Sequence, residues 1–273
     1  MDSAAPKRVA REVEQNTVFR RTARAGYAAS GVVHLLIGVI ALVVALGGDG
    51  DTDQSGALMA IAGAPLGFVV LWIIAVTLWA LGAWQLLEGI LERKPSDDAK
   101  GSTKKWGKRF GEWGQAAIFT ALGLIAASVA LGARVDAEEA AEAASRGVLQ
   151  LPGGSIVLGL VGLAIGVTGI AFVAMGVRRT FRNKIDIPRR GVGRSIAGLG
   201  VVGFIAKGIA LVIVSVLLIV AAVNTDADAA GGLDGAVDAL LALPYGPMLV
   251  AAVGVGFIAY GLFCLFRARF ARF

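Results

Sequence analysis

Six long apolar stretches constrain the fold of this chain more than any other feature of its sequence. Each has 18 to 28 residues, and they cover 26–46, 66–87, 114–131, 156–177, 196–223 and 248–266. An apolar helix of roughly 20 residues spans the hydrocarbon core of a bilayer. The stretches are continuous rather than alternating apolar with polar residues, so strands of a membrane barrel are excluded. The sequence therefore predicts an all-α, polytopic membrane protein with six transmembrane helices.

The basic residues set the orientation of these helices. Of the 26 Lys and Arg residues, 23 lie before the first stretch or after the second, fourth and sixth. The other three connections hold only Arg134 and Arg146, together with eleven carboxylates. Connections rich in Lys and Arg stay in the cytoplasm. This pattern predicts that both termini are cytoplasmic, and it explains the net charge of +6 without nucleic acid binding. The first stretch is too long for a cleaved signal peptide.

The six stretches form three copies of a two-helix unit. A proline opens the second helix of each copy, a glycine follows two residues later, and another glycine follows seventeen residues after the proline. These positions are Pro65, Gly67 and Gly82, then Pro152, Gly154 and Gly169, then Pro244, Gly246 and Gly261. The first helices align through Gly26, Gly111 and Gly203, which precede the prolines by 39, 41 and 41 residues. Proteins built from such copies show a fixed internal period.

This repeat divides the chain into six parts. They are a basic N-terminal arm (1–24), repeat 1 (25–94), a cytoplasmic linker (95–108), repeat 2 (109–184), a second cytoplasmic linker (185–193) and repeat 3 (194–273). Two spans per repeat give all three repeats the same orientation. We therefore expect a pseudo-threefold axis along the membrane normal, with an arc of repeats as the alternative.

The repeated prolines and glycines have physical roles in helix packing. Proline is well tolerated at a helix start because its missing N–H has no intrahelical partner there. The glycine two residues later permits an unusual backbone angle or a close neighbour. The two glycines of each second helix share one face and let membrane helices approach closely. A hinge or a pathway lining is the alternative interpretation of these glycines.

Polar residues inside spans are costly and mark candidate functional sites. The repeat alignment places Ser30, Gln115 and Lys207 at one equivalent position. Three polar groups around a shared axis could hold an anion, with a lipid phosphate at Lys207. However, about 25 Å of helix separates Lys207 from Asn224, so its side chain could instead extend to the cytoplasmic headgroups. Both interpretations of Lys207 stay open.

His34 is the only histidine of the chain and lies four residues after Ser30 on the same helix face. A proton relay or a haem ligand is the functional hypothesis for such a residue. Paired haem ligation would need a second histidine, which the chain does not supply. A hydrogen-bonded histidine with a packing role is the interpretation that we favour.

The connections on the acidic side contain two amphipathic segments, 136–149 and 234–243, for which we predict short helices on the outer surface. The basic N-terminal arm is expected to lie on the inner leaflet, where each basic residue gains about 1 kcal/mol from anionic lipid. The expected partners are thus the lipid bilayer, including anionic lipids, and a membrane protein or a second copy of the chain.

Motifs for catalysis or cofactor binding are not found in the sequence. There is no zinc-protease motif, no phosphate-binding loop, no nucleophile elbow and no carboxylate in the middle of any stretch. The single cysteine, Cys264, cannot form a disulfide within the chain or supply a cysteine metal site. We therefore expect a protein that is not an enzyme and that holds no metal or cofactor.

The first repeat opens with AGYAASGVVH (25–34), and each copy of this unit is followed by a proline-initiated span. In these features the chain resembles the bacterial family called domain of unknown function 1206, from about Arg21 to Phe273. The resemblance implies a membrane location and triplicated helix pairs, and it implies no activity. We expect the plasma membrane of a bacterium. Two functions remain as hypotheses, namely a membrane scaffold or accessory subunit, and a small channel or carrier.

Overall fold

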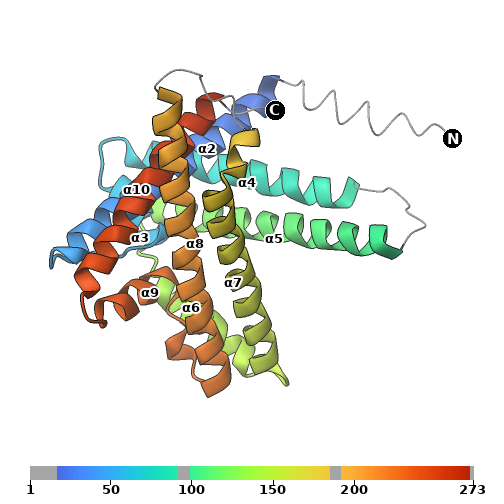
Figure 1. The fold of residues 1–273 in the computed structure, drawn as a ribbon, viewed down its shortest axis with the longest axis vertical. Helices are drawn as coiled ribbons and strands as arrows, with labels where there is room; N and C mark the ends of the chain where they lie inside the picture. Colours follow the sequence, from blue (N-terminus) through green and yellow to red (C-terminus); the bar gives the residue numbers. More distant parts are fainter. Residues whose placement is uncertain (1–16, 92–98, 185–191, 271–273) are drawn as a thin grey trace. The chain divides into compact units, whose positions relative to one another are not determined.

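The computed structural model describes residues 17–91, 99–184 and 192–270. Every regular element in those ranges is helical (Figure 1). The long helices are α2 (Thr17–Ala45), α4 (Gly67–Leu91), α5 (Ala99–Ala130), α7 (Gly154–Arg178), α8 (Val192–Asn224) and α10 (Gly246–Phe270). The short elements are α3 (Gln54–Ala62), α6 (Ala137–Leu149), α9 (Gly232–Leu241) and the 3-10 turns η1 (Thr180–Lys184) and η2 (Ala227–Ala229). The prediction of an all-α protein is confirmed for this part of the chain.

Each predicted apolar stretch coincides with part of one of the six long helices, with at most one residue outside it. In the described residues, α2, α7, α8 and α10 contain segments of 22, 25, 32 and 25 residues that are long and apolar enough to cross a membrane. The described apolar segments of α4 and α5 are shorter, Gly67–Ala83 and Ala116–Ala130. The described chain thus contains four helices of spanning length.

The chain forms two compact units, which are described separately here. Unit 1 comprises Met1–Gly26, Ile61–Arg134 and Phe273, and unit 2 comprises Tyr27–Ala60 and Val135–Arg272. In unit 1, α4 and α5 pack side by side (Figure 1). In unit 2, α8 packs against both α7 and α10. Most of α2 and the short helices α3, α6 and α9 also belong to unit 2.

The predicted linkers and the N-terminal arm are described only in part. Residues 1–16 of the arm and residues 185–191 of the second linker lie outside the described residues. In the first predicted linker, 95–108, the residues from Ala99 onward form the beginning of α5.

The second helix of every repeat begins with the same turn. The residues between the repeated proline and glycine all lie in the left-handed region: Leu66 (φ 64°), Gly153 (φ 76°) and Tyr245 (φ 65°). The carbonyl of each accepts hydrogen bonds from the amides three and four residues later, which starts the helix. A Cβ on the glycine that follows would collide with a carbonyl oxygen of the preceding turn, that of Ile61, Val148 or Leu241. Glycine is therefore present because of a close neighbour, whereas the unusual backbone angle belongs to the residue before it.

Three short helices precede these turns. The helices predicted over 136–149 and 234–243 are confirmed as α6 and α9, although α9 begins at Gly232. Asp136 caps α6, because its Oδ1 accepts hydrogen bonds from the amides of Glu138 and Glu139. The third short helix, α3, was not predicted. Asp53 starts it in a similar way, with Oδ1 accepting from the Gly56 amide at 2.9 Å and from the Ser55 hydroxyl at 2.7 Å.

Glycines allow direct backbone contact between the long helices of unit 2. A Cβ placed on Gly169 of α7 would lie 2.7 Å from the carbonyl oxygen of Gly208 on α8, and the reverse distance is 2.6 Å. Gly261 of α10 and Gly31 of α2 face each other in the same way, at 2.7 and 2.9 Å. Such approach is possible only without side chains at the contact. We call these two contacts, together with the one described next, the glycine seams.

Unit 1 contains the equivalent seam. A Cβ on Gly82 of α4 would lie 2.9 Å from Thr120 Oγ1 and 3.2 Å from the carbonyl oxygen of Ala116, both on α5. Ala116 occupies the repeat position that Gly208 and Gly31 occupy in the other repeats. Each seam therefore joins the second helix of one repeat to the first helix of another. The pairings are repeat 1 with repeat 2, repeat 2 with repeat 3, and repeat 3 with repeat 1.

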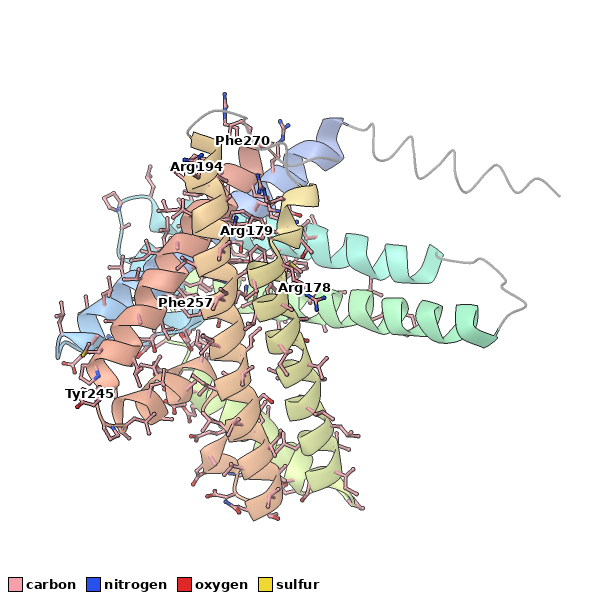
Figure 2. All side chains as sticks on the ribbon, viewed as in Figure 1. Arg178, Arg179, Arg194, Tyr245, Phe257 and Phe270 are labelled. Carbon is pink, nitrogen blue, oxygen red and sulfur yellow. The ribbon has the colours of Figure 1, made fainter. Side chains whose placement is uncertain are left out.

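Charges in unit 2 gather at opposite ends of the long helices. Arg194 lies in the first turn of α8. Figure 2 shows Arg194 and Phe270 at the same end of unit 2, and Tyr245 at the opposite end of α10. Arg178 ends α7 on the basic side. The carboxylates of the loop segments around α3, α6 and α9 lie on the side of the Tyr245 turn. This separation matches the segregation of charge seen along the sequence.

Candidate functional site

The candidate site begins with two polar residues on one face of α2. The His34 ring nitrogen Nδ1 lies 2.7 Å from the backbone carbonyl oxygen of Ser30, one turn earlier. A carbonyl oxygen only accepts, so Nδ1 carries a proton and donates it. The Ser30 hydroxyl lies farther from the same nitrogen, at 3.5 Å. This contact fixes the ring and leaves Nε2 directed away from its own helix.

Lys207 of α8 completes the pair. Its Nζ lies 2.9 Å from His34 Nε2, although the two residues are 173 positions apart in the chain. Because Nδ1 is already protonated, Nε2 of the neutral ring accepts a hydrogen bond from the Lys207 ammonium, and the pair carries a single positive charge. The Lys207 ammonium is thus directed at a neighbouring helix within unit 2. Lys207 therefore makes its contact inside unit 2, with His34.

Aromatic rings surround this pair. Lys207 Nζ lies 4.6 Å from the ring centroid of Tyr260 and 5.6 Å from that of Phe172. The His34 and Tyr260 ring centroids are 4.8 Å apart. A cation over an aromatic face is attracted by the ring quadrupole, more strongly where water is excluded. The rings therefore replace part of the hydration that the ammonium loses inside the protein.

Cys264 lies beside the pair and is 2% exposed. Tyr260, whose ring packs against Lys207 Nζ, lies one turn before Cys264 on α10. Cys264 and Tyr260 belong to a buried cluster with Phe181, Ile196, Phe204 and Phe263. The interior of unit 2 at this level is therefore filled by side chains of α2, α8 and α10.

One member of the predicted polar set, Gln115, is not described together with the others. Gln115 lies on α5, which belongs to unit 1, and its side chain lies outside the described residues. The structure brings together Ser30, His34 and Lys207, all within unit 2. The candidate site therefore consists of Ser30 and His34 from repeat 1 and Lys207 from repeat 3.

Sequence reasoning missed two further residues of the same helix faces. Arg267, one turn beyond Cys264 on α10, donates from Nη2 to the Tyr27 hydroxyl at 2.9 Å. Its guanidinium also lies 4.2 Å from the centroid of the Tyr27 ring. Spacing contained a signal for Tyr27, because Tyr27, Ser30 and His34 lie on one face of α2. We refer to Tyr27, Ser30, His34, Lys207, Tyr260, Cys264 and Arg267 as the Lys207 cluster.

The Lys207 cluster has a definite chemical character. It contains two positive charges, one on Arg267 and one on Lys207, which donates to His34. No carboxylate of the described chain forms an ion pair with either. Likewise, the described residues hold no group of three His, Cys, Asp or Glu arranged for a metal ion. Such a cluster can attract an anion and can hold or release a proton.

A separate acidic cluster lies in the loop segments of unit 2. The Thr52 amide and hydroxyl both donate to Asp234 Oδ1, which ties the segment before α3 to α9. Burial raises the pKa of Asp53, and burial together with repulsion from Asp234 raises the pKa of Asp51, Glu138 and Asp238. These groups bind protons more tightly in the packed loops than in an unfolded chain.

Lowering the pH from about 7.5 to about 5 is therefore expected to slow the opening of α3 and α9. Protonation removes repulsion that exists only while the loops are packed, so their stability rises as the pH falls from neutral toward the ordinary carboxyl range. Amide hydrogen exchange, corrected for intrinsic rates, measures this change. Asp234→Asn should shrink the pH effect, and Glu139→Gln should leave it intact. Faster opening at pH 5 would show the expectation to be wrong.

Comparisons with known proteins agree with the triplicated architecture. The model of the family described as Domain of Unknown Function (DUF1206) matches three times, at residues 25–92, 110–179 and 202–271. The chain is 29% identical over 251 residues to "Uncharacterized protein YxxB" of Bacillus subtilis (strain 168), covering 91% of this chain and 90% of that protein. No solved structure matches the chain. Three matches across most of its length show that the chain belongs to the DUF1206 family.

Proposed function

We propose that this protein is a membrane scaffold or accessory subunit with six spans and no catalytic activity of its own. Both termini lie in the cytoplasm, and the membrane is the plasma membrane of a bacterium. Four helices of spanning length and the strongly asymmetric basic residues support this placement. The relative in Bacillus subtilis supports the bacterial source.

The glycine seams are the observation that carries the proposal. At Gly169 and Gly261 the helices of unit 2 meet backbone to backbone, which leaves no space for a path between the paired helices. The interior near Lys207 is occupied by Tyr260, Phe204 and Phe263. A bundle packed in this way favours a structural role over solute passage.

The order of the seams supports a pseudo-threefold relation of the repeats. The pairings run from repeat 1 to 2, from 2 to 3, and from 3 back to 1. Each involves the same positions, a glycine seventeen residues after the proline and the small residue Gly31, Ala116 or Gly208. A pseudo-threefold relation of the repeats requires equivalent contacts of this kind.

The outward surface of α7 supplies a candidate contact with lipids or a partner. Leu160, Val167 and Ile170 are 59%, 60% and 64% exposed, whereas Leu158 on the same helix is 4% exposed. In a membrane such side chains meet acyl chains or another apolar helix. A scaffold requires a face of this kind that its own fold leaves uncovered.

Site-specific photocrosslinking in native membranes tests the scaffold proposal. A photoreactive residue at Val167 is expected to give a defined protein adduct, either with another membrane protein or with a second copy of this chain. The same residue at Leu158 serves as the matched control and should crosslink only within the chain. Adducts with lipid alone at Val167, Leu160 and Ile170 would count against a scaffold that acts through this face.

A channel or carrier is the second candidate, favoured by the charged pair of Lys207 and His34 inside the spans. Purified protein in liposomes should release trapped ions or small solutes if this candidate holds. We expect no release above that of empty liposomes. Release that is abolished by Lys207→Met would replace the scaffold by a transport function.

A further inference from the structure

Arg267 contains a buried donor that the protein itself does not satisfy. Its Nη2 donates to the Tyr27 hydroxyl, but its Nε is buried and has no hydrogen-bond partner. Among the described residues it is the only buried side-chain nitrogen or oxygen in this condition. Buried N–H groups are nearly always paired, and an exception calls for a missing partner. An arginine Nε–H together with an adjacent N–H matches two oxygens of a phosphate or carboxylate.

The charge around Arg267 calls for the same partner. Lys207 Nζ lies 4.6 Å from the centroid of the Tyr260 ring, and Arg267 follows Tyr260 two turns later on α10, so both cations lie along the same helix. Neither cation is in an ion pair within the described chain. The carboxylates of unit 2 that the structure describes lie in the loop segments around α3, α6 and α9, at the other end of its helices. Positive charge inside a membrane protein is costly unless an anion compensates it.

We propose that Arg267 binds the phosphate of an anionic ligand at the basic end of α10, and that the charge of Lys207 supports this binding from inside unit 2. The Arg267 Nε–H donates to a phosphate oxygen, and the charge of Lys207 attracts the same group from the deeper side. Tyr27 holds the guanidinium in place through its ring and its hydroxyl. The site is independent of whether the protein acts as a scaffold or as a channel.

The position of Arg267 suits a lipid headgroup. It lies in the last turn of α10, three residues before the helix ends at Phe270. Phosphates of the bilayer lie at the ends of spanning helices, outside the hydrocarbon core. The same chemistry is offered by free inorganic phosphate, and the two sources differ in whether acyl chains are needed for binding.

Thermal unfolding of the purified full chain in neutral, phosphate-free detergent tests the site. We expect phosphatidylglycerol to raise the Tm by at least about 3 °C, and phosphatidylcholine to leave it unchanged. Arg267→Gln should lose this shift, and Arg267→Lys, which keeps the charge but not the two-pronged donor, should lose most of it. Arg269→Gln is the matched control, because it removes the same charge from an exposed position two residues away. It should retain the full shift.

Each outcome bears on the proposal. A shift with phosphatidylglycerol alone identifies a lipid headgroup, and a shift with inorganic phosphate as well identifies a site open to free phosphate. Equal shifts in Arg267→Gln and in the unchanged protein would overturn the site, as would an equal loss in Arg269→Gln. No shift of the unchanged protein with either anion would also overturn it, whether or not the variants fold.

Discussion

Gly169→Ala is expected to destabilise the protein by about 1–3 kcal/mol, whereas Gly159→Ala on the same helix is expected to be neutral or slightly stabilising. A Cβ at Gly169 would lie 2.7 Å from the Gly208 carbonyl oxygen and 3.0 Å from the Val212 amide nitrogen, so α7 and α8 would have to separate. At Gly159 the nearest atom is the Ala222 Cβ at 3.8 Å, an ordinary contact. Both changes improve intrinsic helix propensity. A loss of stability in Gly169→Ala but not in Gly159→Ala can therefore be assigned to the close contact with α8.

The buried thiol of Cys264 provides the measurement for this prediction. It is the only cysteine of the chain and is 2% exposed, so a maleimide labels it only when unit 2 opens. The midpoint of labelling during titration with SDS then reports stability. Equal midpoints for Gly169→Ala and Gly159→Ala would refute the account of the seams.

His34→Leu is expected to have the largest effect of any single change in the Lys207 cluster, a loss of about 3 kcal/mol or more. The substitution removes the acceptor of the Lys207 ammonium and leaves that charge among Tyr260 and Phe172 without a polar partner. A buried charge that loses its partner costs more than the pair contributed. The same SDS titration, in phosphate-free neutral detergent, measures the loss.

The double variant His34→Leu with Lys207→Met tests whether the loss comes from the unpaired ammonium. With both polar groups replaced by apolar ones of similar size, the cost of the unpaired charge disappears, and most of the stability should return. Lys207→Met alone gives the third corner of the cycle and controls for any direct effect on Cys264 labelling. A double variant no more stable than His34→Leu would mean that the ammonium does not depend on the histidine.

Much of the helical framework was predictable because the membrane leaves few alternatives. Long apolar stretches must be helical where no water can satisfy the backbone, and all six match long helices to within one residue. The short helix α3 escaped prediction for a physical reason. Its sequence, QSGALMAIA, is apolar on every side, so it lacks the amphipathic pattern that revealed α6. Only the capping residue Asp53 and the symmetry of the repeats indicated its presence.

The candidate site was predictable only where its residues share a helix. Spacing placed Ser30 and His34 on one face of α2, and the repeat alignment singled out Lys207. The contact between His34 and Lys207 depends on tertiary packing across 173 residues, which spacing cannot give. The left-handed turns at Leu66 and Tyr245 were equally hidden, because neither residue type favours that conformation.

The seam between Gly31 and Gly261 has a consequence for how the protein is made. These residues stand near opposite ends of the sequence, yet their helices touch backbone to backbone. During synthesis α2 emerges first. Its surface at Gly31 and Gly38 can pack against α10 only after α10 has entered the bilayer. Until then this glycine surface of α2 can pack against another helix that presents small residues. Completion of the fold is therefore a late event of biogenesis, triggered by the arrival of the last helix.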